Sequence, residues 1–116
     1  MKVLVYSDIH KEFKNPFVPN CEDIDVVVLA GDTDIGCNSM GMLHDLLGKY
    51  KNLNIVFTTG NHEYYGGDIG NIDSRLEDFC KNHSRLHYLQ NSNILINGVR
   101  FIGATLWTDY NKRDLS

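Results

Sequence analysis

Three segments of the chain share one hydrophobic pattern. Lys2 to Tyr6, Asp25 to Ala30 and Asn54 to Thr59 are short runs rich in β-branched residues, and each is followed by polar residues and turn formers. Continuous apolar runs of this length are typical of strands that are buried on both faces of a parallel sheet. The sequence therefore predicts three parallel strands.

Two apolar stripes with spacings of three and four residues lie beyond the second and third runs, and each predicts a helix. The first stripe consists of Leu43, Leu46, Leu47 and Tyr50. The second consists of Ile72, Leu76, Phe79 and Cys80, after the glycines Gly66, Gly67 and Gly70. Asn38 or Ser39 can cap the first helix. Because strands and helices alternate, this part of the chain is predicted to be α/β.

The pattern changes after His83. Leu86 to Leu89, Asn93 to Ile96 and Val99 to Gly103 are short strands set close together. The dipeptide Asn97-Gly98 separates the last two and is typical of a tight antiparallel hairpin. The predicted fold is α/β, with parallel strands and flanking helices followed by an antiparallel hairpin. Residues 1–116 are expected to form a single domain.

Composition and charge narrow the class of protein. The chain is 42% hydrophobic and 22% charged, which is typical of a soluble globular protein. Fifteen acidic residues against eleven basic ones give a net charge of -4, and no cluster of lysine or arginine marks a face for duplex nucleic acid. Strong duplex binding is therefore not expected. Nucleic acid as a substrate stays open, because bound cations reverse the local field.

Cysteines and apolar runs bear on the cellular location. Cys21, Cys37 and Cys80 are widely spaced and form no C-x-x-C pair, so neither a disulfide framework nor a zinc knuckle is predicted. No run approaches the roughly 20 apolar residues of a membrane span, and the first apolar run is too short for a signal peptide. We expect a cytoplasmic protein without a membrane segment.

Polar residues follow each of the three predicted parallel strands. They are Ser7-Asp8-Ile9-His10, Gly31-Asp32-Thr33-Asp34 and Gly60-Asn61-His62-Glu63. Since the carboxyl ends of parallel strands lie at one edge of a sheet, these groups are expected to converge. Carboxylates, an amide and imidazoles together suit Mn, Fe, Zn or a similar divalent ion.

Each group alone has a simpler interpretation. Asp8-x-His10 is a common chance pairing, Gly31-Asp32 can be a turn, and Asn61 can cap a helix. Metal-capable groups at three successive strand ends nevertheless favour a shared site. Asp8 and His10 can bind one ion, and a carboxylate at Asp32 can bridge two ions roughly 3.5 to 4 Å apart. Asn61 can then offer its amide oxygen to the second ion.

The order and spacing of these groups resemble the first three motifs of the calcineurin-like metallophosphoesterases. The resemblance covers residues 1–65 and, more loosely, the stretch from Gly103 to Trp107. It implies part of an αββα sandwich and a site with two divalent ions. By motif, Asp8, His10 and Asp32 hold one ion, and Asp32 and Asn61 hold the other. His62 assists the leaving group.

The activity implied by this resemblance is hydrolysis of phosphomonoesters or phosphodiesters. Nucleotides are among the candidate substrates. Two cations would lower the pKa of a shared water, and the hydroxide would attack phosphorus in line with the leaving oxygen. Asp34 or Glu63 is expected to orient an imidazole. The aromatic residues Tyr64, Tyr65 and Trp107 either line the mouth of the site or simply pack.

The sequence also departs from the family pattern. The family completes its site with a later histidine and a Gly-His-x-His motif, and this sequence contains neither. His44, His83 and His87 are not expected to bind metal. One alternative is therefore a truncated or split phosphoesterase that acts as a non-catalytic interaction subunit, by self-association or with a complementing C-terminal chain. A nucleotide-binding α/β domain is disfavoured because no phosphate-binding glycine loop follows the first strand.

Overall fold

The computed structural model describes residues 1–10, 18–34, 37–60, 62–64 and 67–105, except for the side chains of His62 and Ile69. Its elements, in chain order, are β1 (Val3–Tyr6), β2 (Val26–Ala30), α1 (Met40–Lys49), β3 (Asn54–Thr58), the 3₁₀ turn η2 (His62–Tyr64), α2 (Ile69–Lys81), β4 (Leu86–Tyr88), β5 (Ser92–Ile96) and β6 (Val99–Gly103). The expected α/β class is confirmed.

The first four strands form one parallel sheet in the order β1-β2-β3-β4. The register aligns Val5 with Val28 and Val28 with Val56, so the β-branched positions of neighbouring strands stand side by side. β4, which the sequence pattern grouped with the hairpin, pairs parallel with β3 and extends this sheet. β5 and β6 form the predicted antiparallel hairpin, with Ile96 opposite Val99 across the Asn97-Gly98 turn.

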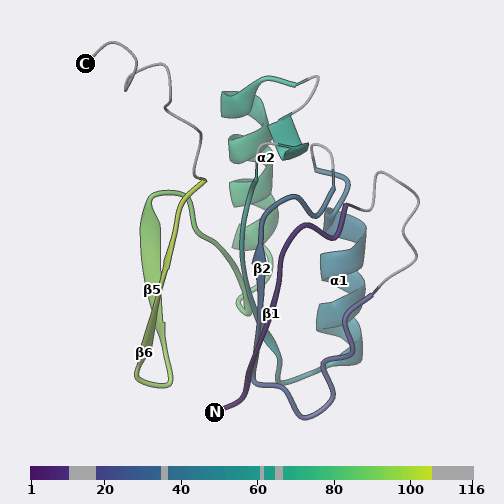
Figure 1. The fold of residues 1–116 in the computed structure, drawn as a ribbon, viewed down its shortest axis with the longest axis vertical. Coiled ribbons are helices and arrows are strands. Elements are labelled where there is room, and N and C mark those ends of the chain that lie inside the picture. Colours follow the sequence, from purple (N-terminus) through teal and green to yellow (C-terminus); the bar gives the residue numbers. More distant parts are fainter. Residues whose placement is uncertain (11–17, 35–36, 61, 65–66, 106–116) are drawn as a thin grey trace.

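The two faces of the parallel sheet are covered by different elements. Both helices supply residues to the larger apolar core on one face, and the β5–β6 hairpin lies on the other (Figure 1). Because successive strand residues point to opposite faces, Val27 and Leu29 belong to the helix side, whereas Val26 and Val28 pack toward the hairpin. The smaller core on the hairpin side contains Val26, Val56, Leu89 and Ile96.

The helix ends differ from the sequence interpretation. Ser39 occupies the N-cap position of α1, but its side chain makes no capping hydrogen bond. The predicted cap position is therefore confirmed, but the side chain does not cap: Ser39 has helical dihedrals (φ -68°, ψ -15°), whereas a capping side chain works from an extended backbone. Asp68 is the residue that caps α2: its backbone is extended and its carboxylate accepts the Gly70 N–H at 3.1 Å.

Coverage of the hairpin side of the sheet is partial. On the edge strand β1, Val3 is 40% exposed and Val5 is 61% exposed. The outer face of the hairpin is also open: Ile102 on β6, next to the packed Phe101, is 81% exposed. In the part of the chain that the structure describes, no helix combines the length and apolar character needed to cross a membrane.

Candidate metal centre

The loops that follow β1 and β2 are joined by backbone hydrogen bonds. Asp8 N donates to Gly31 O at 3.0 Å, and His10 N donates to Asp32 O at 2.8 Å. Pairing between the two segments therefore continues beyond the ends of the strands. The polar groups that follow β1 and β2 are held side by side at the carboxyl edge of the sheet, as the sequence pattern predicted.

The backbone at these positions is strained. Asp8, His10 and Asp32 have φ angles of 57°, 52° and 53°, in the left-handed region that most L residues avoid. Such conformations cost about 1 to 3 kcal/mol each and persist only where the surroundings enforce them. Ile9, between Asp8 and His10, is 7% exposed and belongs to the larger core, which anchors the loop. Strain of this kind is concentrated at functional sites.

The side chains of Asp8, His10 and Asp32, here called the metal group, face one another. Each offers one ligand atom, and the three atoms lie within 4.8 Å of one another; His10 Nε2 is 3.5 Å from Asp8 Oδ1. Ligands bound to one ion at about 2.0 to 2.2 Å lie at most about 4.4 Å apart, so small side-chain rotations suffice for shared coordination. Among the described residues, no other cluster of three His, Cys, Asp or Glu side chains is this close.

The charge state of Asp8 suits coordination. A hydrogen bond from the Ser7 side chain is the largest influence and lowers the pKa of the Asp8 carboxyl. Burial opposes it, and contacts with Asp32 and His10 lower the pKa further, so the net direction is downward. The carboxyl is therefore ionised at neutral pH, as a metal ligand must be. Its side chain is 63% exposed, so this carboxylate is open to solvent.

Glu63 joins the loop after β2 to the loop after β3. Its carboxylate accepts three backbone hydrogen bonds, from Asp32 N at 2.9 Å, Thr33 N at 2.8 Å and Gly60 N at 2.8 Å. The residue is 3% exposed, and this burial raises the pKa of its carboxyl while the backbone donors oppose part of the rise. Where the sequence suggested an orienting contact with an imidazole, the contacts described for Glu63 are with backbone N–H groups.

Close packing of Gly31 against Gly60 completes this support. A Cβ on Gly31, whose φ is 103°, would lie 2.8 Å from Gly60 N. A Cβ on Gly60 would overlap the carboxylate of Asp32 and lie 2.7 Å from its backbone nitrogen. Both positions therefore require glycine, because the backbone of one loop lies directly on the other.

The remaining predicted site residues are placed only in part. The backbone of His62 begins η2, directly before Glu63, but its side chain and the whole of Asn61 lie outside the described residues. Asp34 is half-buried, two residues beyond Asp32. The roles of Asn61, His62 and Asp34, and the binding of a second ion, therefore stay predictions.

The three histidines that were not expected to bind metal lie away from the metal group. Nε2 of His87 is 3.0 Å from Asn54 Oδ1 on the neighbouring strand, and burial lowers the pKa of this imidazole. The ring of His83 packs against Phe79, with centroids 4.8 Å apart, and against His44 at 5.8 Å. Each has a structural neighbour that accounts for it.

A comparison with protein families agrees with this geometry. The family model of the calcineurin-like phosphoesterases matches residues 1–114, nearly the whole sequence. The chain belongs to the calcineurin-like phosphoesterase family. This confirms the resemblance and extends it through the hairpin, beyond the residues whose motifs suggested it. None of the curated proteins compared with this phosphoesterase matches it.

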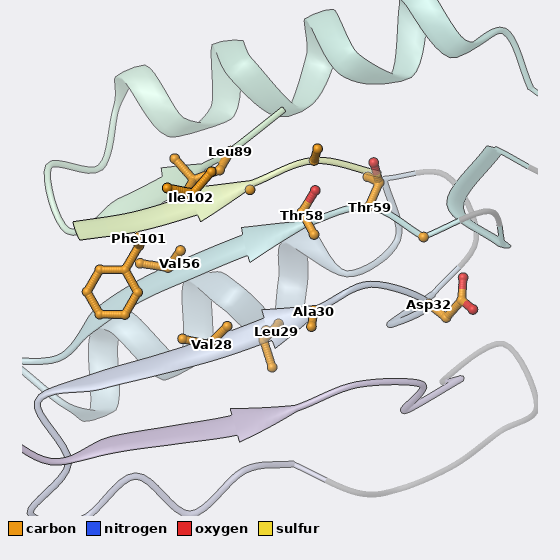
Figure 2. A pocket seen from close by; sticks show the side chains of 13 residues that line it. Val28, Leu29, Ala30, Asp32, Val56, Thr58, Thr59, Leu89, Phe101 and Ile102 are labelled. Carbon is orange, nitrogen blue, oxygen red and sulfur yellow. The ribbon is translucent and has the colours of Figure 1, made fainter. Parts of the chain in front are cut away.

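A groove leads from the metal group of this phosphoesterase into the space between the sheet and the hairpin. It has a volume of about 420 Å³ and runs from Asp32 and Gly60 to Phe101 of β6. Figure 2 shows Val28 and Val56 on the sheet, with Phe101 and Ile102 on the adjacent strand β6. The walls of the groove are mainly apolar, and its polar end is formed by Asp32 and Thr59.

The sequence pattern did not indicate a set of polar side chains around Thr59, at the carboxyl end of β3, here called the tyrosine network. Its members are Thr59, Tyr64, Asp73, Tyr88, Gln90 and Thr105. Tyr64 was considered for the mouth of the site, but it is 6% exposed and its hydroxyl lies within this network. The members are scattered along the chain, so no local spacing could have revealed the network. Tyr65 and Trp107, also considered for the mouth, lie outside the described residues.

Proposed function

We propose that this chain is a metal-dependent hydrolase of phosphomonoesters or phosphodiesters that works with two divalent ions. Asp8, His10 and Asp32 hold one ion, and Asp32 and Asn61 hold the other. The observation that carries the proposal is the metal group: two carboxylates and an imidazole, each on left-handed backbone, converge at the carboxyl edge of the sheet in a member of this family.

The chain's own residues divide the work. Bound divalent ions would activate water and neutralise charge on the phosphoryl oxygens. His62 follows Asn61 directly and donates a proton to the leaving oxygen. Glu63 keeps the loops of Asp32 and Gly60 together through its backbone hydrogen bonds. Asp34 orients an imidazole of the site.

Hydrolysis assays on the purified chain test this proposal. p-Nitrophenyl phosphate and bis-p-nitrophenyl phosphate would be incubated with Mn²⁺ or with EDTA, for the wild type and for His10→Ala, His62→Ala and His44→Ala. We expect turnover that needs Mn²⁺ and is lost in the first two variants. His44→Ala is the matched control, because that side chain is 67% exposed and outside the metal group. Turnover that persists in EDTA or in His10→Ala would refute the proposal.

A second candidate is a non-catalytic interaction subunit, by self-association or with a complementing chain. The observation that favours it is the exposure of apolar residues around the hairpin side of the sheet, Val5 and Ile102 above all. Sedimentation of the wild type and of Val5→Ser tests it. A concentration-dependent dimer that Val5→Ser dissociates would support it, and a monomer at all concentrations would count against it. For either function we expect a cytoplasmic location, in line with the three free cysteines.

A further inference from the structure

The tyrosine network joins the loop of the metal centre to the rest of the fold. Thr59 directly follows β3 and is 2% exposed. Its hydroxyl shares a hydrogen bond with the Tyr64 hydroxyl at 2.6 Å. Thr105, just after β6, donates its hydroxyl to Thr59 O at 2.6 Å, and its backbone N–H reaches Gln90 Oε1 at 2.8 Å. The hairpin is therefore fastened to the end of β3 at the edge where the metal group lies.

The Tyr64 hydroxyl is a central member of this network. It donates to Asp73 Oδ1 at 2.6 Å and accepts from Gln90 Nε2 at 2.9 Å, in addition to its contact with Thr59. Its ring is buried in the larger core, a role that phenylalanine would fill equally well. The hydroxyl therefore contributes something that packing alone does not require.

Tyr64 is adjacent to Glu63 in η2. Glu63 in turn accepts hydrogen bonds from the N–H groups of Asp32 and Thr33. The turn η2 therefore connects the tyrosine network to Asp32, a member of the metal group. We propose that Tyr64 is a positioning residue: its hydroxyl holds η2 in place, so that Glu63 keeps Asp32 in its left-handed conformation. The inference rests on the proposed function only in that Asp32 is there a metal ligand.

Tyr88 offers a matched control. Its hydroxyl donates to the same oxygen of Asp73 at the same 2.6 Å and also contacts Thr59 Oγ1 at 3.2 Å and the Tyr64 hydroxyl at 3.4 Å, but it lies on β4 and not in η2. Burial, with Asp73 as acceptor, raises the pKa of Tyr88, so it stays a donor at neutral pH. Tyr64→Phe and Tyr88→Phe each remove one donor from Asp73 and are expected to lower Tm by a similar amount, roughly 4 °C.

Amide hydrogen exchange, measured by NMR on the metal-free chain, decides the proposal. We expect the amides of Asp32 and Thr33 to exchange about tenfold faster in Tyr64→Phe than in Tyr88→Phe. The amide of Ile55, which donates to Arg85 O within the sheet, serves as the reference and is expected to change equally in both variants. Equal exchange of Asp32 and Thr33 in the two variants would overturn the proposal.

Calorimetric titration with Mn²⁺ shows whether this positioning reaches the metal. We expect Tyr64→Phe to weaken binding about tenfold and Tyr88→Phe to change it less than about twofold. If the wild type binds Mn²⁺ and both variants bind it equally well, the proposed effect of Tyr64 on metal affinity is overturned. If the wild type binds no Mn²⁺, the proposed function fails, while hydrogen exchange still decides whether Tyr64 positions Asp32.

Discussion

Two carboxylates at the same edge of the sheet, Glu63 and Asp8, have opposite surroundings. Glu63 is 3% exposed, and its oxygens accept three backbone N–H groups. The Asp8 side chain is 63% exposed and its neighbours are the side chains of Ser7, His10 and Asp32. The oxygens of Glu63 are occupied by the protein itself, whereas those of Asp8 remain accessible to an ion.

This difference distinguishes the residues that hold the loops together from the residues that are proposed to bind the metal. The buried side, made of Glu63 and the packed pair Gly31 and Gly60, holds the loops together. The solvent side, made of the metal group, carries the candidate ligand atoms on strained backbone. Loss of the support is expected to reduce stability, and loss of a ligand is expected to reduce metal binding without unfolding the chain.

Glu63→Ala tests the support and has the largest expected effect. We expect the free energy of unfolding to fall by about 3 kcal/mol, because three N–H donors lose a charged acceptor in a buried site. Urea denaturation in EDTA measures it. Glu77→Ala, at an exposed position of α2, is the control and is expected to change stability by less than about 0.5 kcal/mol. Equal losses in the two variants would mean that Glu63 does not clamp the loops.

Asp8→Asn tests the solvent side. Asparagine has the same shape and tolerates the left-handed backbone, so the stability of the metal-free chain is expected to remain within about 0.5 kcal/mol of the wild type. Mn²⁺ affinity is expected to fall on the order of 100-fold, about 2.7 kcal/mol, because a charged ligand becomes neutral. Calorimetry measures it. Asp78→Asn, on the exposed face of α2, is the matched control, and a similar loss there would show that Mn²⁺ binds non-specifically.

Gly60→Ala tests the contact between the two sides. Its Cβ would overlap the loop of Asp32, so we expect stability to fall by about 2 kcal/mol and Mn²⁺ affinity to fall with it. The same substitution at Gly48 in α1 meets no atom within 4 Å and is expected to raise stability by about 0.5 kcal/mol. Thermal melts of both variants measure the two effects. Two shifts of the same sign would contradict the assigned packing.

Much of the fold could be predicted from local patterns. The strand ranges read from the sequence agree with the structure to within one residue, and both apolar stripes lie on helices except for Tyr50, which is the C-cap of α1. β4 was grouped with the wrong sheet, since a short apolar run does not reveal its partner. The position of the N-cap of α1 was predicted, but not the missing capping hydrogen bond: whether the Ser39 side chain caps the helix depends on its backbone dihedrals, which the residue type does not determine.

The sequence indicated three residues that the structure brings together, but not how they are held in place. Polar residues at the strand ends indicated Asp8, His10 and Asp32, and the structure brings these together. The left-handed backbone, the clamp by Glu63 and the tyrosine network had no counterpart in the pattern.

The sequence by itself determined which residues form strands and helices and at which edge of the sheet the candidate ligands gather, because hydrophobic period and strand polarity are local properties. Only the tertiary structure decided what each polar group contacts. Thr59 and Thr105 are 46 residues apart in sequence, and Asp32 and Glu63 are 31 apart, yet each pair is joined by hydrogen bonds. Such contacts depend on how the sheet, helices and hairpin pack together, which residue spacing along the chain does not specify.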